Sequence, residues 1–214
     1  MTDALTTATL RLFHSPGSPF VRKVRVVAME AGIADRVALL PSAAHPIQRD
    51  ATILPANPLG QVPTLLLADG AALYDSRAIC EYLDHEARAG LFPAPGPARW
   101  RALREQALAD GLMNAAILLR YEAVARAEGE RSAAWVEGQT AKVAGALDEM
   151  ARAVPERGRP LDIGAISLGC ALGYLDFRFA AMDWRKGREG LAEWFAVLSE
   201  RPSFRETVPF APSA

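Results

Sequence analysis

The sequence predicts a small α/β domain followed by an all-helical domain. Short apolar runs bounded by Gly, Pro and Ser, which are typical of strands and turns, occur before residue 75. From residue 98 onward the chain is rich in Ala, Leu, Glu and Arg, which favour helices. Between these parts, residues 91–97 (LFPAPGP) contain three prolines and a glycine. We therefore predict an α/β domain over 1–90, a linker over 91–97 and a helical domain over 98–214.

The chain begins with a predicted β-α-β unit. Residues 9–13 (TLRLF) predict a strand that ends in the turn-forming HSPGSP. The next segment predicts a helix with Ser18 as N-cap and Pro19 as its first residue, and Gly32 is expected to end it. Residues 36–41 predict a second strand, parallel to the first through a right-handed crossover.

A connector, a hairpin and a helix complete the predicted α/β domain. Residues 42–58 are rich in proline, which predicts loops with room for one short helix. Asp69-Gly70 lies between VPTLLL and AALY and predicts a β-hairpin. A helix is expected to begin at Asp75-Ser76, so the order is βαβ, connector, ββα.

The remaining sequence predicts a helical bundle. Residues with high helix propensity and helical periodicity predict four helices, over 98–128, 131–153, 162–180 and 188–199.

Composition excludes several classes of protein. Of the 214 residues, 24 are Lys or Arg and 25 are Asp or Glu, and a net charge of −1 argues against nucleic acid or anionic membrane as partners. No apolar run approaches the roughly 20 residues of a membrane span, and the start of the chain lacks the pattern of a signal peptide. Cys80 and Cys170 lie in apolar segments without metal-binding spacing, which predicts buried thiols, no metal and a cytoplasmic location.

Three motifs in the first half carry a family resemblance. They are SPFVRKVRV (18–26), NPLGQVPTL (57–65) and YDSRAICEYL (74–83), in the order found in the N-terminal domain of glutathione transferases. Two weaker matches, EQALADGLMNA (105–115) and LDIGAISLGCALGYLDF (161–177), extend the likeness into the second half. The chain thus resembles the serine-type bacterial glutathione S-transferases. This resemblance implies a thioredoxin-like first domain, glutathione as co-substrate and a homodimer.

Ser18 is the predicted catalytic residue. A cysteine thiol has a pKa of about 8.5, so only a few per cent of it is thiolate at pH 7. A hydroxyl donor at a helix N-terminus stabilises the thiolate through a hydrogen bond and the helix dipole. Ser18 has this position, Ser15 in the preceding turn is the alternative, and a simple N-cap role for Ser18 remains open.

The resemblance also implies how glutathione would bind. Phe20 would lie at the mouth of the site, and a cis Val62–Pro63 bond would present the Val62 backbone to the cysteinyl part of glutathione. Asp75 and Ser76, at a helix start, would receive the γ-glutamyl end. The family more often has Glu at the position of Asp75, which leaves the orientation of this pair open.

The glycyl carboxylate of glutathione requires a donor from the connector. Arg49 is the first candidate by its spacing from Asn57, and His45 is the second. Alternatively, Arg49 is a solvent-exposed charge in a loop and has no role in binding.

Three functions follow from the resemblance. The first is a glutathione transferase whose thiolate attacks a small hydrophobic electrophile. The second is a glutathione-dependent isomerase or oxidoreductase, although the thiol–disulfide type normally has a cysteine near the first helix, and here the nearest is Cys80. The third is a non-catalytic binding protein with the same fold.

The second half is expected to form the pocket for the electrophile. Met113, Asn114, Ile117 and Arg120 recur at helical spacing. Such a stripe is more often bundle core than a ligand wall.

Overall fold

The computed structural model describes residues 10–43, 45–154 and 159–211 of the chain. These residues divide into two compact units. The first comprises the described residues of Met1–Phe92 and Pro209–Ala214, and the second comprises those of Pro93–Val208.

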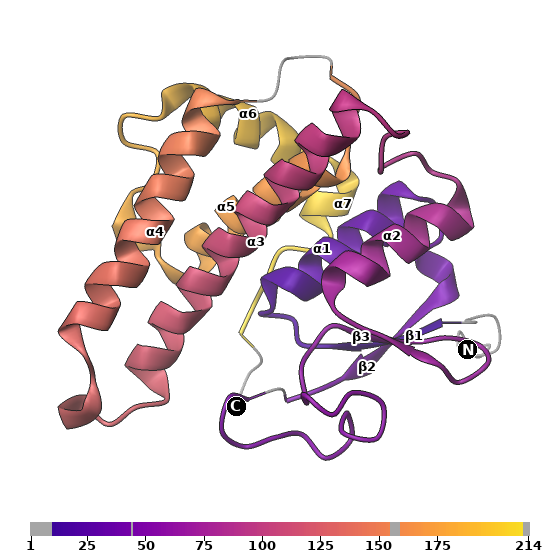
Figure 1. Ribbon diagram of the computed structural model, residues 1–214, viewed down its shortest axis with the longest axis horizontal. Helices are drawn as coiled ribbons and strands as arrows, with labels where there is room; N and C mark the ends of the chain where they lie inside the picture. Colours follow the sequence, from indigo (N-terminus) through magenta and orange to yellow (C-terminus); the bar gives the residue numbers. More distant parts are fainter. Residues whose placement is uncertain (1–9, 44, 155–158, 212–214) are drawn as a thin grey trace. The chain divides into compact units, whose positions relative to one another are not determined.

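A four-stranded mixed sheet forms the centre of the first unit (Figure 1). Its strands are β1 (Leu10–His14), β2 (Val37–Pro41), β3 (Thr64–Leu66) and β4 (Ala72–Leu73), in the order β2-β1-β3-β4. β1 and β2 are parallel, and β3 is antiparallel to both β1 and β4. The predicted βαβ unit and hairpin are therefore confirmed, although Thr9 of the predicted first strand lies outside the described residues.

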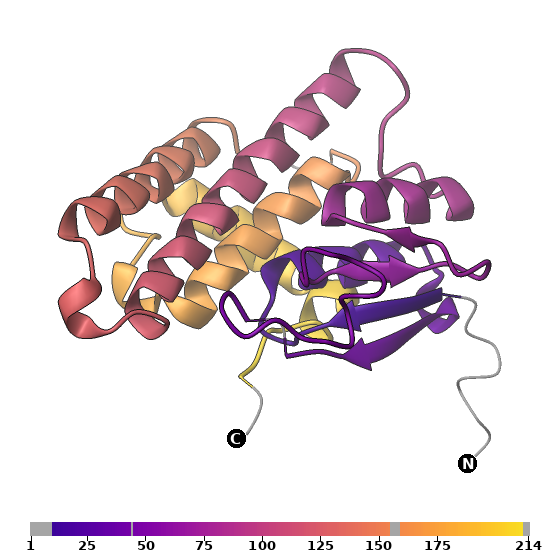
Figure 2. The same cartoon turned by 60° about the horizontal axis from the view of Figure 1, so that its bottom comes forward.

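Two helices cover one side of this sheet (Figures 1 and 2). α1 (Pro19–Glu30) starts after the N-cap Ser18, and α2 (Ser76–Ala87) starts after the N-cap Asp75. Apolar side chains of both helices and of the sheet form a core from which water is excluded. Its fully buried members include Leu12, Val24, Val27, Leu65, Ile79 and Leu83.

Shorter segments connect these elements. A 3-10 turn, η1 (Ala34–Arg36), leads into β2, and Gly32 before it has a φ of 70° that favours glycine. Residues 45–63 contain turns and no helix, so the connector forms loops alone. After α2, the backbone N–H groups of the buried Leu91 and Phe92 donate to the Asp84 carboxylate at 2.6 and 3.2 Å.

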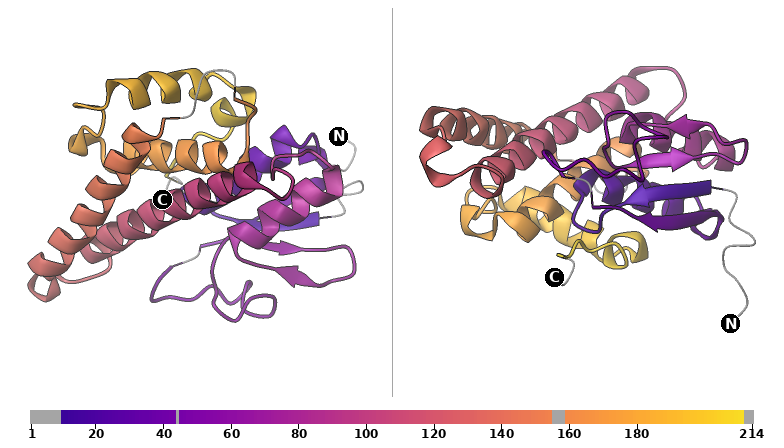
Figure 3. Two further views of the ribbon diagram at one scale, coloured as in Figure 1. Left: turned by 45° about the horizontal axis from the view of Figure 1, so that its top comes forward. Right: turned by 90° about the horizontal axis from the view of Figure 1, so that it is seen from below.

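Helices form the second unit (Figure 3). α5 (Ile163–Arg178) and α4 (Ala133–Arg152) both pack against the long α3 (Pro97–Val124), and α5 is buried from Ile163 to Leu175. The remaining elements are short: η2 (Glu128–Glu130), η3 (Ala180–Met182), α6 (Glu189–Ser199) and α7 (Pro202–Arg205).

Both ends of α3 differ from the prediction. α3 begins at Pro97, which was expected in the linker, because proline is well accommodated at the first helical position, where no N–H is needed. α3 ends at Val124 rather than at residue 128, and η2 begins at Glu128 after three non-helical residues. The short α7 was not predicted.

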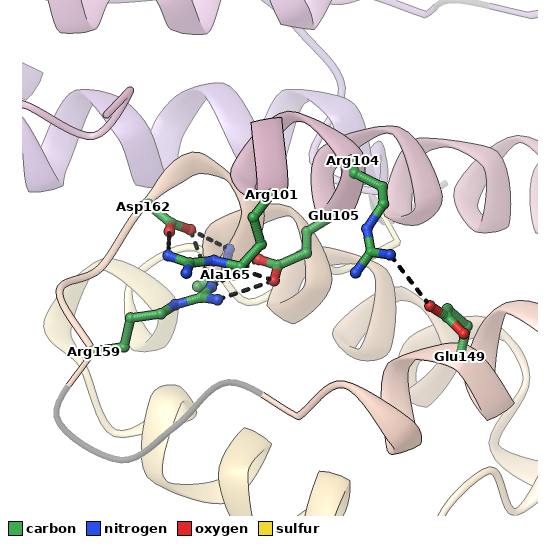
Figure 4. Close-up of polar contacts among 7 residues, drawn as sticks. All are labelled: Arg101, Arg104, Glu105, Glu149, Arg159, Asp162 and Ala165. Carbon is green, nitrogen blue, oxygen red and sulfur yellow. Dashed lines mark hydrogen bonds and ion pairs between the residues drawn. The ribbon is translucent and has the colours of Figure 1, made fainter. Parts of the chain in front are cut away.

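The crossing of α3 and α5 is close at Gly164. A Cβ atom at this position would lie 2.9 Å from the Ala102 carbonyl oxygen and 2.5 Å from Glu105 Oε2. Arg159 joins the two helices, since its guanidinium donates to Glu105 at 2.7 and 2.9 Å and to Asp162, the N-cap of α5, at 3.2 Å (Figure 4). The start of α5 is thus held by polar contacts as well as by packing.

Candidate functional site

Four chain segments of the first unit leave the sheet at the same edge. Phe13 at the end of β1 lies opposite Thr64 at the start of β3, and Leu73 at the end of β4 lies opposite Leu65. β2 ends beside β1, where the Ser42 N–H donates to the His14 carbonyl at 2.9 Å. The sheet therefore brings together residues 15–18, 42–43, 62–63 and 74–76, which contain or adjoin most of the predicted site residues.

Ser18 lies at this edge as the N-cap of α1. Its Oγ accepts a hydrogen bond from the Val21 N–H at 3.3 Å, and its backbone is extended, as an N-cap requires. A hydroxyl group has one donor and two acceptor positions, so this bond leaves its hydrogen able to donate. Ser15 lies one turn earlier, and its carbonyl accepts from the Ser18 N–H at 3.0 Å.

The preceding residue, His14, is uncharged at neutral pH. Burial, and next to it the positive charge of Arg25, lower the pKa of the His14 imidazole below its ordinary value. The N-terminus of α1 adds a partial positive charge at this edge.

Phe20 is half-buried in the first turn of α1. The Lys23 ammonium lies 5.7 Å from the centroid of its ring. This cation–π contact joins Phe20 to a side chain that is itself completely buried.

The Val62–Pro63 peptide bond is cis, as the resemblance implied. The turn before it is held by Asn57, which is 1% exposed. The Asn57 amide donates to Thr64 Oγ1 at 2.9 Å and accepts from the Leu59 N–H at 3.0 Å. Asn57 thus fixes the backbone on both sides of Val62 and Pro63.

Asp75 and Ser76 differ in their environments. Asp75 is exposed, and its carboxylate accepts from the Arg77 N–H at 2.9 Å, which makes it the N-cap of α2. Ser76 is the first residue of the helix and is 2% exposed. The peptide bond between Tyr74 and Asp75 is also cis.

The two connector candidates, Arg49 and His45, are both exposed. The Arg49 guanidinium donates to the Pro58 carbonyl and lies near Gly60. His45 Nδ1 accepts from the N–H groups of Ile47 and Gln48 at 3.2 and 3.1 Å, so only Nε2 of His45 is able to donate to a ligand.

Asp50 was not among the predicted residues, yet it organises this connector. Its carboxylate accepts from Ser42 Oγ at 2.9 Å, from the Ala43 N–H at 3.0 Å, and from Thr52 Oγ1 and N–H at 2.7 and 2.9 Å. These bonds, those from Thr52 above all, lower the pKa of the Asp50 carboxyl. The Asp-x-Thr sequence at 50–52 is the local signal for such a turn, but the bond to Ser42 has no such signal.

Cys80 and Cys170 are both buried thiols. Within the described ranges 10–43, 45–154 and 159–211, no group of three or more His, Cys, Asp and Glu side chains could hold a metal ion. In the same ranges, no helix combines the length and apolar character that crossing a bilayer requires.

The stripe on α3 has a mixed character. Met113 is fully buried and belongs to the core of the helical unit, whereas Asn114 is exposed. Ile117 and Arg120 are half-buried. Of these four residues, only Met113 is therefore entirely within the core.

Comparisons with known proteins identify the family. The glutathione S-transferase N-terminal domain matches residues 17–86, and the glutathione S-transferase C-terminal domain matches residues 133–196. A curated relative, the uncharacterized GST-like protein YibF of Escherichia coli K12, is 31% identical over 205 residues. The match covers 94% of this chain and 98% of the length of YibF. The chain belongs to the glutathione S-transferase family.

Solved structures of a Pseudomonas fluorescens Pf-5 glutathione transferase family member have the same fold. The structure with bound glutathione shares 46% identity and a TM-score of 0.92, over 94% of this chain and 100% of that chain. The structure with bound S-(propanoic acid)-glutathione shares 44% identity and a TM-score of 0.87, again over 94% and 100%. The thioredoxin-like first unit and the helical second unit are those of the family.

Proposed function

We propose that this protein binds glutathione at the sheet edge of the first unit and activates its thiol for attack on a small hydrophobic electrophile. The observation that carries the proposal is the position of Ser18, a hydroxyl at the N-terminus of α1 with its hydrogen able to donate to a thiolate. Family membership and glutathione-bound relatives support the choice of ligand.

The required stabilisation is modest. A thiol pKa lowered by one to two units corresponds to about 1.4–2.7 kcal/mol in favour of the thiolate. A charge-assisted hydrogen bond together with a helix N-terminus supplies an amount of this order. The Ser18 hydroxyl and the amides of the first turn of α1 are the proposed donors.

The other predicted residues have roles in binding the peptide. The backbone of Val62, ahead of Pro63, would pair with the cysteinyl part of glutathione, and Phe20 would cover it. The N-terminus of α2, with Ser76 and the N-cap Asp75, would receive the γ-glutamyl carboxylate through backbone N–H groups. Arg49 would reach the glycyl carboxylate.

We also propose a cytoplasmic homodimer, as the family resemblance implies. Sedimentation equilibrium would then give twice the 23.0 kDa mass of the chain. The alternative function is a non-catalytic glutathione-binding protein, which would bind the peptide without lowering the pKa of its thiol.

The first test is a titration of the bound glutathione thiol between about pH 4 and 10, followed by thiolate absorbance, in the wild type and in Ser18→Ala. We expect a thiol pKa one to two units below about 8.5 in the wild type, and loss of that shift in Ser18→Ala with binding retained.

Ser15→Ala is the matched control, because Ser15 supplies a second hydroxyl in the same turn. It should leave the thiol pKa unchanged. If Ser15→Ala removes the shift and Ser18→Ala does not, the activating role belongs to Ser15. An unshifted thiol in the wild type would favour the non-catalytic alternative.

A further inference from the structure

The Asp50 carboxylate links two parts of the connector in the first unit. Its Oδ2 atom accepts from Ser42 Oγ at 2.9 Å and from the Ala43 N–H at 3.0 Å. Its Oδ1 atom accepts from Thr52 Oγ1 at 2.7 Å and from the Thr52 N–H at 2.9 Å. A single side chain therefore joins the residues that follow β2 to the turn that begins at Asp50.

Both ends of this link are fixed to the body of the first unit. The Ser42 N–H donates to the carbonyl of His14, at the end of β1, at 2.9 Å. The Ile53 N–H donates to the Asp50 carbonyl at 3.2 Å, and the Ile53 side chain is completely buried. Asp50 thus connects the sheet edge on one side to a core residue on the other.

Arg49 is the residue next to this link. Its guanidinium donates through Nη2 to the Pro58 carbonyl, and a Cβ atom at Gly60 would lie 3.6 Å from Arg49 Nε. The Arg49 side chain therefore lies against the turn that precedes the cis Val62–Pro63 bond. A guanidinium has five N–H donors, which suit a carboxylate, and the bond to Pro58 uses one of them.

An ordered backbone matters for Arg49 because its side chain is exposed. Exposed ion pairs are weak, in part because a long side chain loses conformational freedom when it binds. A side chain whose backbone and guanidinium are already held in place loses less freedom on binding. The hydrogen bonds to Asp50, those from Thr52 above all, lower the pKa of its carboxyl, so the link is ionised at neutral pH.

We infer that Asp50 is a positioning residue, which holds Arg49 in place to bind the glycyl carboxylate of glutathione. The inference rests on the proposed function for the ligand and deepens it, because it names the side chain on which recognition of this end of the peptide depends. An anionic side chain repels a carboxylate, so Asp50 acts through Arg49 and not by touching the ligand.

The binding test compares glutathione with its C-terminal amide, in which a neutral carboxamide of the same shape replaces the glycyl carboxylate. Both are titrated into the full chain by calorimetry, and we expect the wild type to prefer glutathione. Arg49→Gln should weaken glutathione binding about fivefold, the upper range for an exposed ion pair, and Asp50→Asn about threefold. Both variants should leave binding of the amide unchanged.

The direction of the effect separates positioning from charge. Removal of a negative charge near the site would by itself strengthen the binding of an anionic group. Weaker glutathione binding in Asp50→Asn therefore reports lost positioning, whereas stronger binding would overturn the inference.

Asp69→Asn is the matched control. Asp69 is an exposed aspartate of the same unit, and its carboxylate accepts from the Ala71 N–H at 2.9 Å in the hairpin turn. The change removes the same charge and a bond of the same kind, and it should leave the preference for glutathione unchanged. An equal loss of preference in Asp69→Asn would show that the effect is not specific to Asp50 and would refute its positioning role.

Ser42→Ala tests the link while it keeps the charge of Asp50. It removes one of the hydrogen bonds to Oδ2 and should reduce the preference for glutathione about twofold. If Asp50→Asn does not fold, Ser42→Ala provides the test alone, and an unchanged preference in it would overturn the inference.

A double variant tests whether Asp50 acts through Arg49. In the Arg49→Gln background, Asp50→Asn should have no further effect on the preference, because the side chain that it positions is missing. A further loss of preference in the double variant would mean that Asp50 acts through another donor, and the assignment to Arg49 would be wrong.

The same titrations distinguish this inference from the proposed function. Equal weakening of glutathione and amide binding in Asp50→Asn would show a purely structural role and refute the inference. A wild type that binds both peptides equally and lowers the thiol pKa would refute the inference and leave the proposed function standing. A wild type that binds neither peptide would refute both.

Discussion

At the scale of single residues, the buried amide of Asn57 stabilises the backbone of the candidate site through hydrogen bonds. It bonds to Thr64 at the start of β3 and to the Leu59 N–H in the preceding turn. Val62 and Pro63 lie between these anchored points. The geometry of the proposed peptide-binding backbone therefore depends on a side chain that itself has no proposed contact with the ligand.

We predict that Asn57→Ala lowers the free energy of unfolding by about 1–3 kcal/mol, because buried hydrogen-bonding groups lose their partner. Urea denaturation measures this change. Asn114→Ala, at an exposed position of α3, is the control and should change the stability by no more than about 0.5 kcal/mol. Equal changes in the free energy of unfolding in Asn57→Ala and Asn114→Ala would mean that the hydrogen bonds of Asn57 add nothing specific to stability.

Sequence patterns identified some of these residues and missed others for a physical reason. Ser18 and Asp75 are N-caps, whose bonds are local and leave a recognisable pattern. Asp50 bonds to Ser42 across a loop, and Arg159 pairs with Glu105 only after two helices pack. Such contacts between residues distant in sequence leave no periodic pattern.

At the scale of elements, the close crossing of α3 and α5 depends on Gly164. A methyl group there would lie 2.9 Å from a backbone carbonyl of α3, closer than packed atoms tolerate. The glycines of α4 differ, since a Cβ atom at Gly138 would have no atom within 4 Å.

We predict that Gly164→Ala destabilises the protein by about 1–3 kcal/mol through overpacking. Gly138→Ala, the same change at an exposed position within α4, should stabilise it by up to about 1 kcal/mol through helix propensity. Thermal unfolding of the two variants measures both changes. A stabilising Gly164→Ala would contradict the close crossing described here.

Elements were predicted best where their starts have chemical signals. Ser18 before α1 and Asp75 before α2 were both expected at helix starts, and both are N-caps. The end of α3 and the short α7 were not predicted, because helix ends depend on packing as much as on propensity. The strands β3 and β4 are shorter than the apolar runs that predicted the hairpin.

At the scale of the whole molecule, local composition along the chain predicted an α/β unit followed by a helical unit. Strand-forming and helix-forming residues separate along the chain, and a proline-rich segment divides them. Function was less predictable, because one fold supports many different activities.

We predict that glutathione stabilises the folded protein, because a ligand that binds only the native state raises its stability. At 100 times the dissociation constant the gain is about 2.7 kcal/mol. Thermal unfolding with and without glutathione measures it, and S-methylglutathione, in which a thioether replaces the ionisable thiol, tests whether binding needs a free thiol or thiolate. Unchanged unfolding at saturating glutathione would count against the proposed ligand.

The first unit contains residues from both ends of the chain, since the described residues of Pro209–Ala214 group with those of Met1–Phe92. Pro209 is buried, although residues 93–208 separate it from the rest of its unit. During synthesis on the ribosome, the sheet and its helices emerge early but lack this residue until the helical unit has been made. Completion of the first unit therefore comes after synthesis of the second.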